Sequence, residues 1–291
     1  MPEDVTHPSS EKKWTATNAR PLSGMHRILV TLLLATSVVH ADSYPGKKSN
    51  FHGFERYDFQ FAGRKAIIVA PKQAAADKPW VWRARFFGHQ PQADVEMLKH
   101  GWHIAYADVG GLFGAPSAVE HWNKFHQHVT SKWGFHQRPV LEGMSRGGLI
   151  IFNWAKLNPD KVTAIYGDAP VCDFKSWPGG KGDGKGSPKT WQQCLKIYGF
   201  NETEALDAKV NPIDGLESLA KAKIPVLNVV GDADVVVPVK ENSDILEHRY
   251  RKLGGPIKVI HKPGIGHHPH SLKDPAPIVN FFLHAFSPSV N

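Results

Sequence analysis

Residues 139–148 read PVLEGMSRGG, and residues 149–157 continue as the apolar segment LIIFNWAKL. The first apolar run predicts a buried strand, and the second segment has the length and composition of a helix. Between them lies the pattern G-x-S-x-G, with Ser145 at its centre. Such a turn lifts the serine clear of a sheet edge, and its glycines let neighbouring backbone approach. The stretch therefore predicts a nucleophilic serine at the N-terminal end of a helix, where the helix dipole favours developing negative charge.

A nucleophilic serine needs a base, and the base needs an acid that orients it. Two later segments read as buried strands and end in such residues: 225–230 (PVLNVV) and 257–260 (IKVI). The first is followed by two candidate acids, Asp232 and Asp234, and the second by two candidate bases, His267 and His268. The order serine, acid, histidine is that of one hydrolase arrangement and differs from the orders of the two well-known serine protease types.

The rest of the chain alternates β-rich stretches with helical ones. The predicted strands are 57–61, 66–70, 80–86 and 102–107, and the predicted helices are 93–100 and 118–133. This alternation is typical of an α/β protein, in which helices cover both faces of a sheet.

The segment 25–41 has the features of a secretory signal peptide. His26 and Arg27 precede an apolar run over 28–39, and small side chains follow at Val39 and Ala41. The run is shorter than the roughly 20 apolar residues that span a bilayer, so we expect no stable membrane insertion. We interpret 1–41 as an N-terminal extension and a signal peptide, with translation starting at Met25, and we predict that the mature chain, 42–291, is secreted or periplasmic. The alternative is a buried core helix.

The net charge of +8 comes from 35 basic and 27 acidic side chains that are spread along the chain. No run of five like charges occurs, which argues against a nucleic-acid-binding arm, although a basic surface can concentrate anionic substrates. Export would place Cys172 and Cys194 in an oxidising compartment, where they could form a disulfide or remain two buried thiols.

We predict neither a metal nor a cofactor. The histidines of the segment 118–133 are His121, His126 and His128. His126 and His128 are two residues apart and cannot share a helix face, and no carboxylate stands at ligand spacing. We interpret these histidines as solvated or packed side chains.

From 51 to 286 the chain resembles the α/β-hydrolase superfamily. Three stretches are similar to a group of exported bacterial proteins described as esterases: EGMSRGG at 142–148, APVCDFKSWPGG at 169–180 and GHHPH at 266–270. The resemblance implies one α/β-hydrolase domain over 42–291, with a mostly parallel central sheet and a small cap-like insertion at about 173–200. It selects Asp234, through the pattern G-x-x-D-x-x-V-P, and His267, through G-x-G-H.

The resemblance also implies an oxyanion hole, and residues close to it in the chain are candidates for binding substrate. The oxyanion would be held by the backbone N–H groups of Arg146 and His89. Arg146, together with Arg83 or Arg85, could bind a carboxylate or the ester of an acidic sugar, unless these arginines form structural ion pairs. Trp177 could stack on a sugar, together with Trp191 and Tyr198, unless these rings form only a small core within the insertion.

These observations favour an exported serine hydrolase that cleaves a carboxylic ester through an acyl-enzyme. We expect the substrate to be a small-molecule or polysaccharide ester linked to carbohydrate. Two alternatives remain open: a peptidase of the prolyl-oligopeptidase type, and a binding module that uses the same fold without chemistry.

Overall fold

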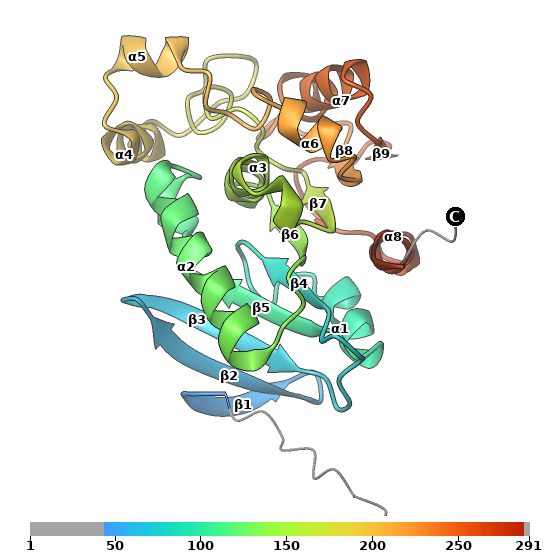
Figure 1. Ribbon diagram of the computed structural model, residues 1–291. Coiled ribbons are helices and arrows are strands. Elements are labelled where there is room, and N and C mark those ends of the chain that lie inside the picture. The colour runs from blue at the N-terminus through green and yellow to red at the C-terminus, as the bar shows by residue number, and fades with distance from the viewer. Residues whose placement is uncertain (1–43, 288–291) are drawn as a thin grey trace, which may run out of the picture. The chain divides into compact units, whose positions relative to one another are not determined.

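The computed structural model describes residues 44–287. These residues form a twisted β-sheet with helices packed against it (Figure 1). Within these residues nine strands hydrogen-bond in the order β1-β2-β3-β5-β4-β6-β7-β8-β9. Their bounds are β1 Lys47–Phe51, β2 Phe54–Phe61, β3 Arg64–Ala70, β4 Trp80–Arg83, β5 His103–Ala107, β6 Val140–Met144, β7 Ala164–Asp168, β8 Val226–Gly231 and β9 Ile257–Lys262.

The sheet is antiparallel at one end and parallel elsewhere. Strands β1, β2, β3 and β5 pair antiparallel in succession. From β5 through β4, β6, β7 and β8 to β9 every pairing is parallel. The predicted mostly parallel sheet is confirmed. Since parallel strands end at one edge, the loops after β4, β6, β7, β8 and β9 can meet there.

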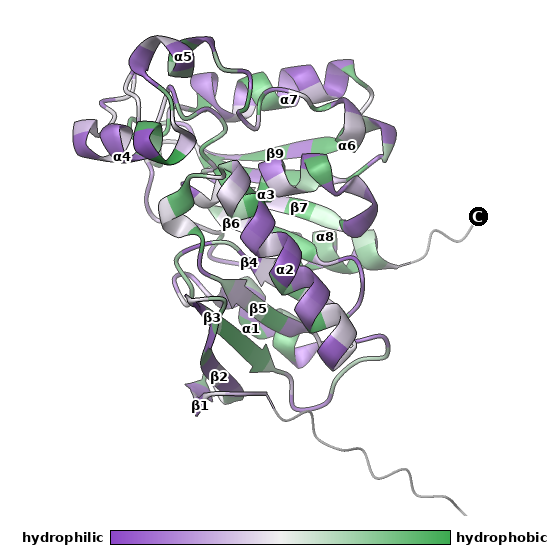
Figure 2. Cartoon of the chain, turned by 60° about the vertical axis from the view of Figure 1, so that its left-hand side comes forward, coloured by the Kyte–Doolittle hydropathy of each residue, from purple (hydrophilic) through white to green (hydrophobic). Residues whose placement is uncertain are grey.

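Helices cover both faces of this sheet, as the sequence predicts. Their bounds are α1 Gln92–Lys99, α2 Pro116–Trp133, α3 Gly147–Leu157, α4 Pro188–Tyr198, α5 Glu202–Asp207, α6 Glu217–Lys221, α7 Ser243–Lys252 and α8 Ala276–Phe286. Side chains alternate along each strand. Trp80 and Trp82 therefore join a core cluster with α2, α3, α6 and α7, whereas Val81 joins a cluster with α1 and α8. In Figure 2 β3 is largely green, β1 at the edge of the sheet is mostly purple, and purple residues mark the outer side of α2.

The predicted insertion forms a small layer with its own core. Helices α4 and α5 pack through Trp191, Cys194 and Ala205 onto Phe113 and Leu149. The layer therefore runs beyond residue 200, the predicted end, because α5 supplies part of this core. It lies between β7 and β8 in the chain (Figure 1).

Three segments differ from the sequence prediction. The strand predicted over 80–86 ends at Arg83, and Phe86 has a left-handed backbone with φ of 51° that a strand cannot contain. Strand β1 was not predicted, since its sequence KKSNF is polar and four of its five residues are exposed. Strand β7, AIYGD, is buried throughout and was also not predicted.

Both cysteines are free thiols in the structure, and the disulfide considered from the sequence does not form. Cys172 belongs to the main core cluster and Cys194 to the core of the insertion. Burial raises the pKa of Cys194 to about 12 and shifts that of Cys172 in the same direction. Both thiols are therefore poor nucleophiles near neutral pH.

The predicted extension and signal peptide, 1–41, lie outside the described residues. Among residues 44–287, no helix combines the length and the apolar character that crossing a membrane requires.

Arg83 lies at the end of β4, where it is 1% exposed. Its guanidinium pairs with Asp94 of α1, lies 3.5 Å from Glu142 Oε1 of β6, and donates to the carbonyl oxygen of His89. Burial raises the pKa of Glu142 well above its usual range, although the positive charge of Arg83 opposes this shift. Arg83 thus joins β4, β6, α1 and the loop after β4 behind the sheet edge.

Replacing Arg83 should destabilise the fold strongly. Arg83→Met would leave Asp94 and Glu142 buried without their cation, which is expected to lower the free energy of unfolding by about 3–5 kcal/mol. The matched control is Arg251→Met, which removes an exposed ion pair with Glu247 on α7 and should change it by less than about 1 kcal/mol. Urea unfolding measures both, and equal losses would contradict the structural role of Arg83.

Candidate active site

Ser145 lies on the turn from β6 to α3, with a left-handed backbone and φ of 49°. Three backbone hydrogen bonds hold this conformation. Its N–H donates to the carbonyl oxygen of Asp168 at 2.8 Å, and its own carbonyl oxygen accepts from Gly148 at 2.9 Å and from Val171 at 2.8 Å. A left-handed conformation is uncommon for residues other than glycine and persists where surrounding contacts enforce it. The turn holds the Ser145 hydroxyl in one place.

The glycines around Ser145 differ in whether the structure leaves room for a side chain in their place. A Cβ at Gly143 would lie 2.8 Å from the backbone of Gly147, and a Cβ at Gly148 would lie 2.6 Å from the carbonyl oxygen of Val171. Gly147, the glycine of the motif itself, has ordinary space, with its nearest neighbours 3.5 Å away. The close approach that the sequence analysis expected at 143 and 147 therefore occurs at 143 and 148.

Ser145, His267 and Asp234 form a hydrogen-bonded chain. Ser145 Oγ lies 3.0 Å from His267 Nε2, and His267 Nδ1 lies 2.7 Å from Asp234 Oδ2. Asp234 Oδ1 accepts from the N–H groups of Val236 and Val237, each at 2.8 Å. This network favours the neutral tautomer in which Nδ1–H donates to Asp234 and Nε2 accepts from the serine hydroxyl.

The acid is buried, and its surroundings still favour its charged form. Burial by itself would raise the pKa of Asp234, but the hydrogen bonds from His267 and from the backbone of Val237 and Val236 outweigh it, so that the pKa lies below its ordinary value. A charged carboxylate can stabilise the imidazolium that forms when His267 takes a proton.

The loops that carry acid and base are fastened together at the end of β8. Ala233 N–H donates to the carbonyl oxygen of Ile265 at 2.9 Å. A Cβ at Gly231 would collide with the carbonyl oxygens of Ile265 and Gly266, so only glycine fits there. This contact places Asp234 beside His267.

The two residues that the sequence analysis kept as alternatives lie elsewhere. Asp232 bonds to His261 Nδ1 at 2.8 Å, and both side chains are exposed. His268 is exposed and has no hydrogen bond to Ser145 among the described residues. The structure brings together the set Ser145, Asp234 and His267.

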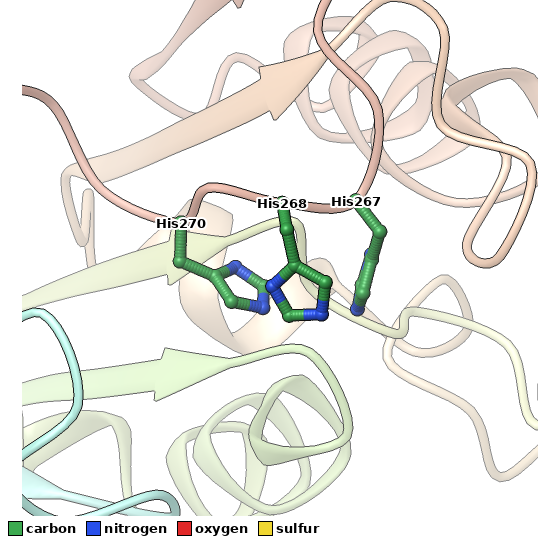
Figure 3. A group of neighbouring side chains, drawn as sticks. All are labelled: His267, His268 and His270. Carbon is green, nitrogen blue, oxygen red and sulfur yellow. The ribbon is translucent and has the colours of Figure 1, made fainter.

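A second buried aspartate–histidine pair lies beside this chain, and the sequence analysis missed it. His270 Nδ1 lies 2.7 Å from Asp168 Oδ1, and the other oxygen of Asp168 accepts from the N–H of Ser271 and from Tyr166. Figure 3 shows the rings of His267, His268 and His270 on one loop. The pair anchors that loop to Asp168, the last residue of β7, whose backbone carbonyl oxygen also accepts the hydrogen bond from the Ser145 N–H. Two features of the sequence could have indicated this pair: Asp168 ends the apolar stretch AIYGD, and His270 lies three residues after His267.

The three histidines lie close enough to raise the question of a metal. Their candidate ligand atoms lie within 4.8 Å of one another. Both ring nitrogens of His267 are already engaged, by Asp234 and Ser145, and Nδ1 of His270 is engaged by Asp168. A cation here would have to displace the Ser145–His267 hydrogen bond, so this arrangement suits proton transfer better than metal binding.

Backbone donors for an oxyanion lie on two sides of Ser145. Arg146 N–H follows the serine and has no hydrogen-bond acceptor among residues 44–287, which leaves it available for the expected role. His89 N–H does not fit the expected role, because it donates to the carbonyl oxygen of Phe86 at 2.9 Å within a tight turn. The structure offers Arg85 instead. Its N–H also lacks an acceptor among those residues, and it lies 3.9 Å from where a Cβ of Gly147 would be.

The side chains expected to bind substrate take different positions. Arg83 is enclosed by its carboxylates and out of reach of a substrate, which corrects the expectation for this residue. Arg85 and Arg146 are half-buried near Ser145, and Trp177 is half-buried beside Arg146, with 5.3 Å between the guanidinium carbon and the ring centroid. Trp191 is 4% exposed in the core of the insertion, and Tyr198 packs against that core, so neither forms a sugar-stacking wall.

The comparisons with known proteins identify the fold and no more. No protein-family model and no curated protein matches this chain. Among solved structures, an acylaminoacyl peptidase in complex with Z-Gly-Gly-Phe-chloromethyl ketone is similar with a TM-score of 0.56 and 16% identity, over 74% of this chain and 38% of that one. An uncomplexed Pyrococcus horikoshii acylaminoacyl peptidase has a TM-score of 0.55 and 16% identity, over 74% of this chain and 38% of that one. A puromycin hydrolase has a TM-score of 0.58 and 17% identity, over 74% of this chain and 36% of that one.

This chain therefore spans less than two fifths of the length of those structures. At such low identity the similarity shows that the chain has an α/β-hydrolase fold, the fold that its sequence motifs predicted.

Gly148→Ala should disturb both the fold and the serine. The added Cβ would press on Val171, whose N–H holds the Ser145 carbonyl oxygen, and overpacking of this kind destabilises by about 1–3 kcal/mol. The matched control is Gly111→Ala, because a Cβ there meets nothing within 4 Å. Urea unfolding and labelling of Ser145 by a fluorophosphonate report the two effects. If both variants behave alike, the packing of Gly148 does not matter.

Proposed function

We propose that this protein is a serine hydrolase that cleaves a carboxylic ester through an acyl-enzyme on Ser145. The observation that supports the proposal most is the hydrogen-bonded chain from Ser145 through His267 to Asp234. In this mechanism His267 accepts the serine proton during attack and then returns it to the leaving alcohol. Asp234 holds the tautomer and stabilises the imidazolium. Water then attacks the acyl carbon while His267 takes one of its protons, and the bond between that carbon and Ser145 Oγ breaks as His267 passes the proton to Ser145, which releases the carboxylic acid.

The oxyanion of each tetrahedral intermediate would be held by the backbone N–H groups of Arg146 and Arg85. Both donors lack other acceptors among the described residues, and each such donor contributes on the order of 3 kcal/mol to the transition state in serine hydrolases. The chemistry needs no cofactor. We propose that the enzyme works outside the cytoplasm, on the strength of the segment 25–41.

The bond that is cleaved is proposed to be an ester in a carbohydrate-linked substrate. Trp177, half-buried next to Arg146, offers part of a ring face for a sugar. A second candidate is a peptidase, because the solved structures of similar fold include acylaminoacyl peptidases. A binding module without chemistry is a weaker candidate, since it would not require a hydroxyl, an imidazole and a buried carboxylate aligned in series.

Removing the serine or the histidine should abolish turnover. Ser145→Ala and His267→Ala are each expected to lower kcat on the order of 10⁶-fold, because the pair acts as one unit, and Asp234→Asn by less, about 10⁴-fold. His268→Ala and Asp232→Asn serve as matched controls and should keep most of the activity. The measurement is kcat with one 4-nitrophenyl ester, together with a thermal melt for each variant. A folded His267→Ala protein with most of its activity would rule out His267 as the base.

Matched substrates separate the esterase from the peptidase. We expect N-acetylalanine 4-nitrophenyl ester to be hydrolysed and the 4-nitroanilide with the same acyl group to be cleaved at a kcat lower by at least about 10³-fold, a difference of about 4 kcal/mol in barrier. Equal kcat values for the two would mean that the enzyme forms the acyl-enzyme rapidly from an amide as well, and would favour the peptidase. A fluorophosphonate that leaves Ser145 of the folded protein unlabelled would favour the binding module.

A further inference from the structure

Two arginine side chains next to Ser145 have no hydrogen-bond or ion-pair partner among residues 44–287. Arg146 follows the serine in the chain, and Arg85 lies against the start of α3, where a Cβ of Gly147 would be 3.5 Å from that of Arg85. Neither guanidinium forms a hydrogen bond or an ion pair with any of these residues, and each Nε is buried without an acceptor. Buried polar groups are seldom left unpaired, so each such group calls for an explanation.

Aromatic rings support both guanidinium groups and leave hydrogen-bonding edges unused. The guanidinium carbon of Arg146 lies 5.3 Å from the ring centroids of both Phe113 and Trp177. That of Arg85 lies 4.6 Å from the Phe86 centroid. A guanidinium held over a ring keeps the N–H groups in its plane available to bind a carboxylate with two parallel hydrogen bonds.

The two positive charges are close and only partly balanced. Burial and, second, repulsion from Arg85 lower the pKa of Arg146 to about 10. The carboxylate of Asp108 acts electrostatically on both arginines, but its Oδ1 already accepts from the Tyr106 hydroxyl and the Gly110 N–H. It forms no ion pair within 4.0 Å with either arginine in the described chain. Arg83 shows the contrast, because two carboxylates surround it.

We propose that Arg85 and Arg146 form a binding site for a carboxylate of the substrate, beside the nucleophile. This inference rests on the proposed function for its catalytic meaning and adds that the substrate is anionic: an ester that also bears a free carboxylate, as in chains of acidic sugars. The backbone N–H groups of these residues face the oxyanion, and their side chains select the charge. One bound carboxylate would accept from the terminal N–H groups of the guanidinium edges and balance part of the excess positive charge.

Matched ester pairs test the selectivity. One pair carries the charge on the acyl side, 4-nitrophenyl valerate and mono-4-nitrophenyl glutarate, and the other on the leaving group, phenyl acetate and 3-carboxyphenyl acetate. In at least one pair the wild-type protein should favour the anionic ester in kcat/KM by about tenfold or more at low ionic strength, and about 0.5 M salt should reduce this preference. A preference for the neutral ester in both pairs would overturn the proposal.

Variants assign the preference to the two side chains. Arg85→Gln and Arg146→Gln should each reduce the ratio of anionic to neutral kcat/KM by about tenfold, whatever they do to the activity itself. Arg85→Lys and Arg146→Lys keep the charge without the planar fork and should retain part of the preference. Arg251→Gln removes the same charge from α7, at an exposed pair with Glu247, and should leave the ratio unchanged. Variants that keep the wild-type ratio would contradict the site.

A binding measurement does not depend on hydrolysis. In full-length Ser145→Ala protein, calorimetric titration should show that galacturonate binds at least about tenfold more tightly than galactose, and adding Arg85→Gln or Arg146→Gln should remove the difference. If this arginine-dependent binding occurs but no ester is hydrolysed, the hydrolase proposal fails and the carboxylate site stands. If esters are hydrolysed but galacturonate binds no better than galactose, the carboxylate site fails and the hydrolase proposal stands.

Discussion

The left-handed backbone of Ser145 is the constraint on which the rest of the site depends. A residue with a side chain stays in this conformation when its neighbours hold it there, and here Asp168, Gly148 and Val171 do so through three backbone hydrogen bonds. The requirement extends outward. Gly148 must lack a side chain so that Val171 can approach, and β7 must end beside β6 so that its last carbonyl can receive the serine N–H.

Asp168 connects this turn to the loop that carries His267. Its backbone carbonyl holds Ser145, and its carboxylate holds His270 and Ser271 on the loop that carries His267. The distance from His267 Nε2 to Ser145 Oγ is thereby set from both sides by one residue. A sheet edge formed by parallel strands makes this possible, because β6, β7 and β8 all deliver their last residues to the same place.

The arginines near the site divide into two kinds according to their partners. Arg83 is buried with Asp94 and Glu142 and fastens the loop after β4. Arg85, two residues on, and Arg146 lie near Ser145 and contact aromatic rings, and neither has a carboxylate partner in the described chain. Residue type alone does not separate the two kinds, since each is an arginine close to a strand end. The degree of burial separates the two kinds. A fully buried cation requires carboxylate partners, whereas a half-buried cation can remain without them until a ligand binds.

The sequence by itself determined the strand–serine–helix stretch, the order of serine, acid and histidine, and the α/β architecture, because these depend on local patterns: apolar periodicity, glycine spacing and position at a strand end. The resemblance to the α/β-hydrolase superfamily added the ranking of Asp234 above Asp232 and of His267 above His268. Only the tertiary structure decided which side chains meet. Arg83 is buried against carboxylates, and the His89 N–H is used in a turn, whereas the Arg85 N–H has no acceptor in the described chain. Cys172 and Cys194 remain free thiols, and Asp168 pairs with His270. These outcomes depend on contacts between residues up to 102 positions apart, and the packing of the sheet edge, which no local pattern encodes, fixes them.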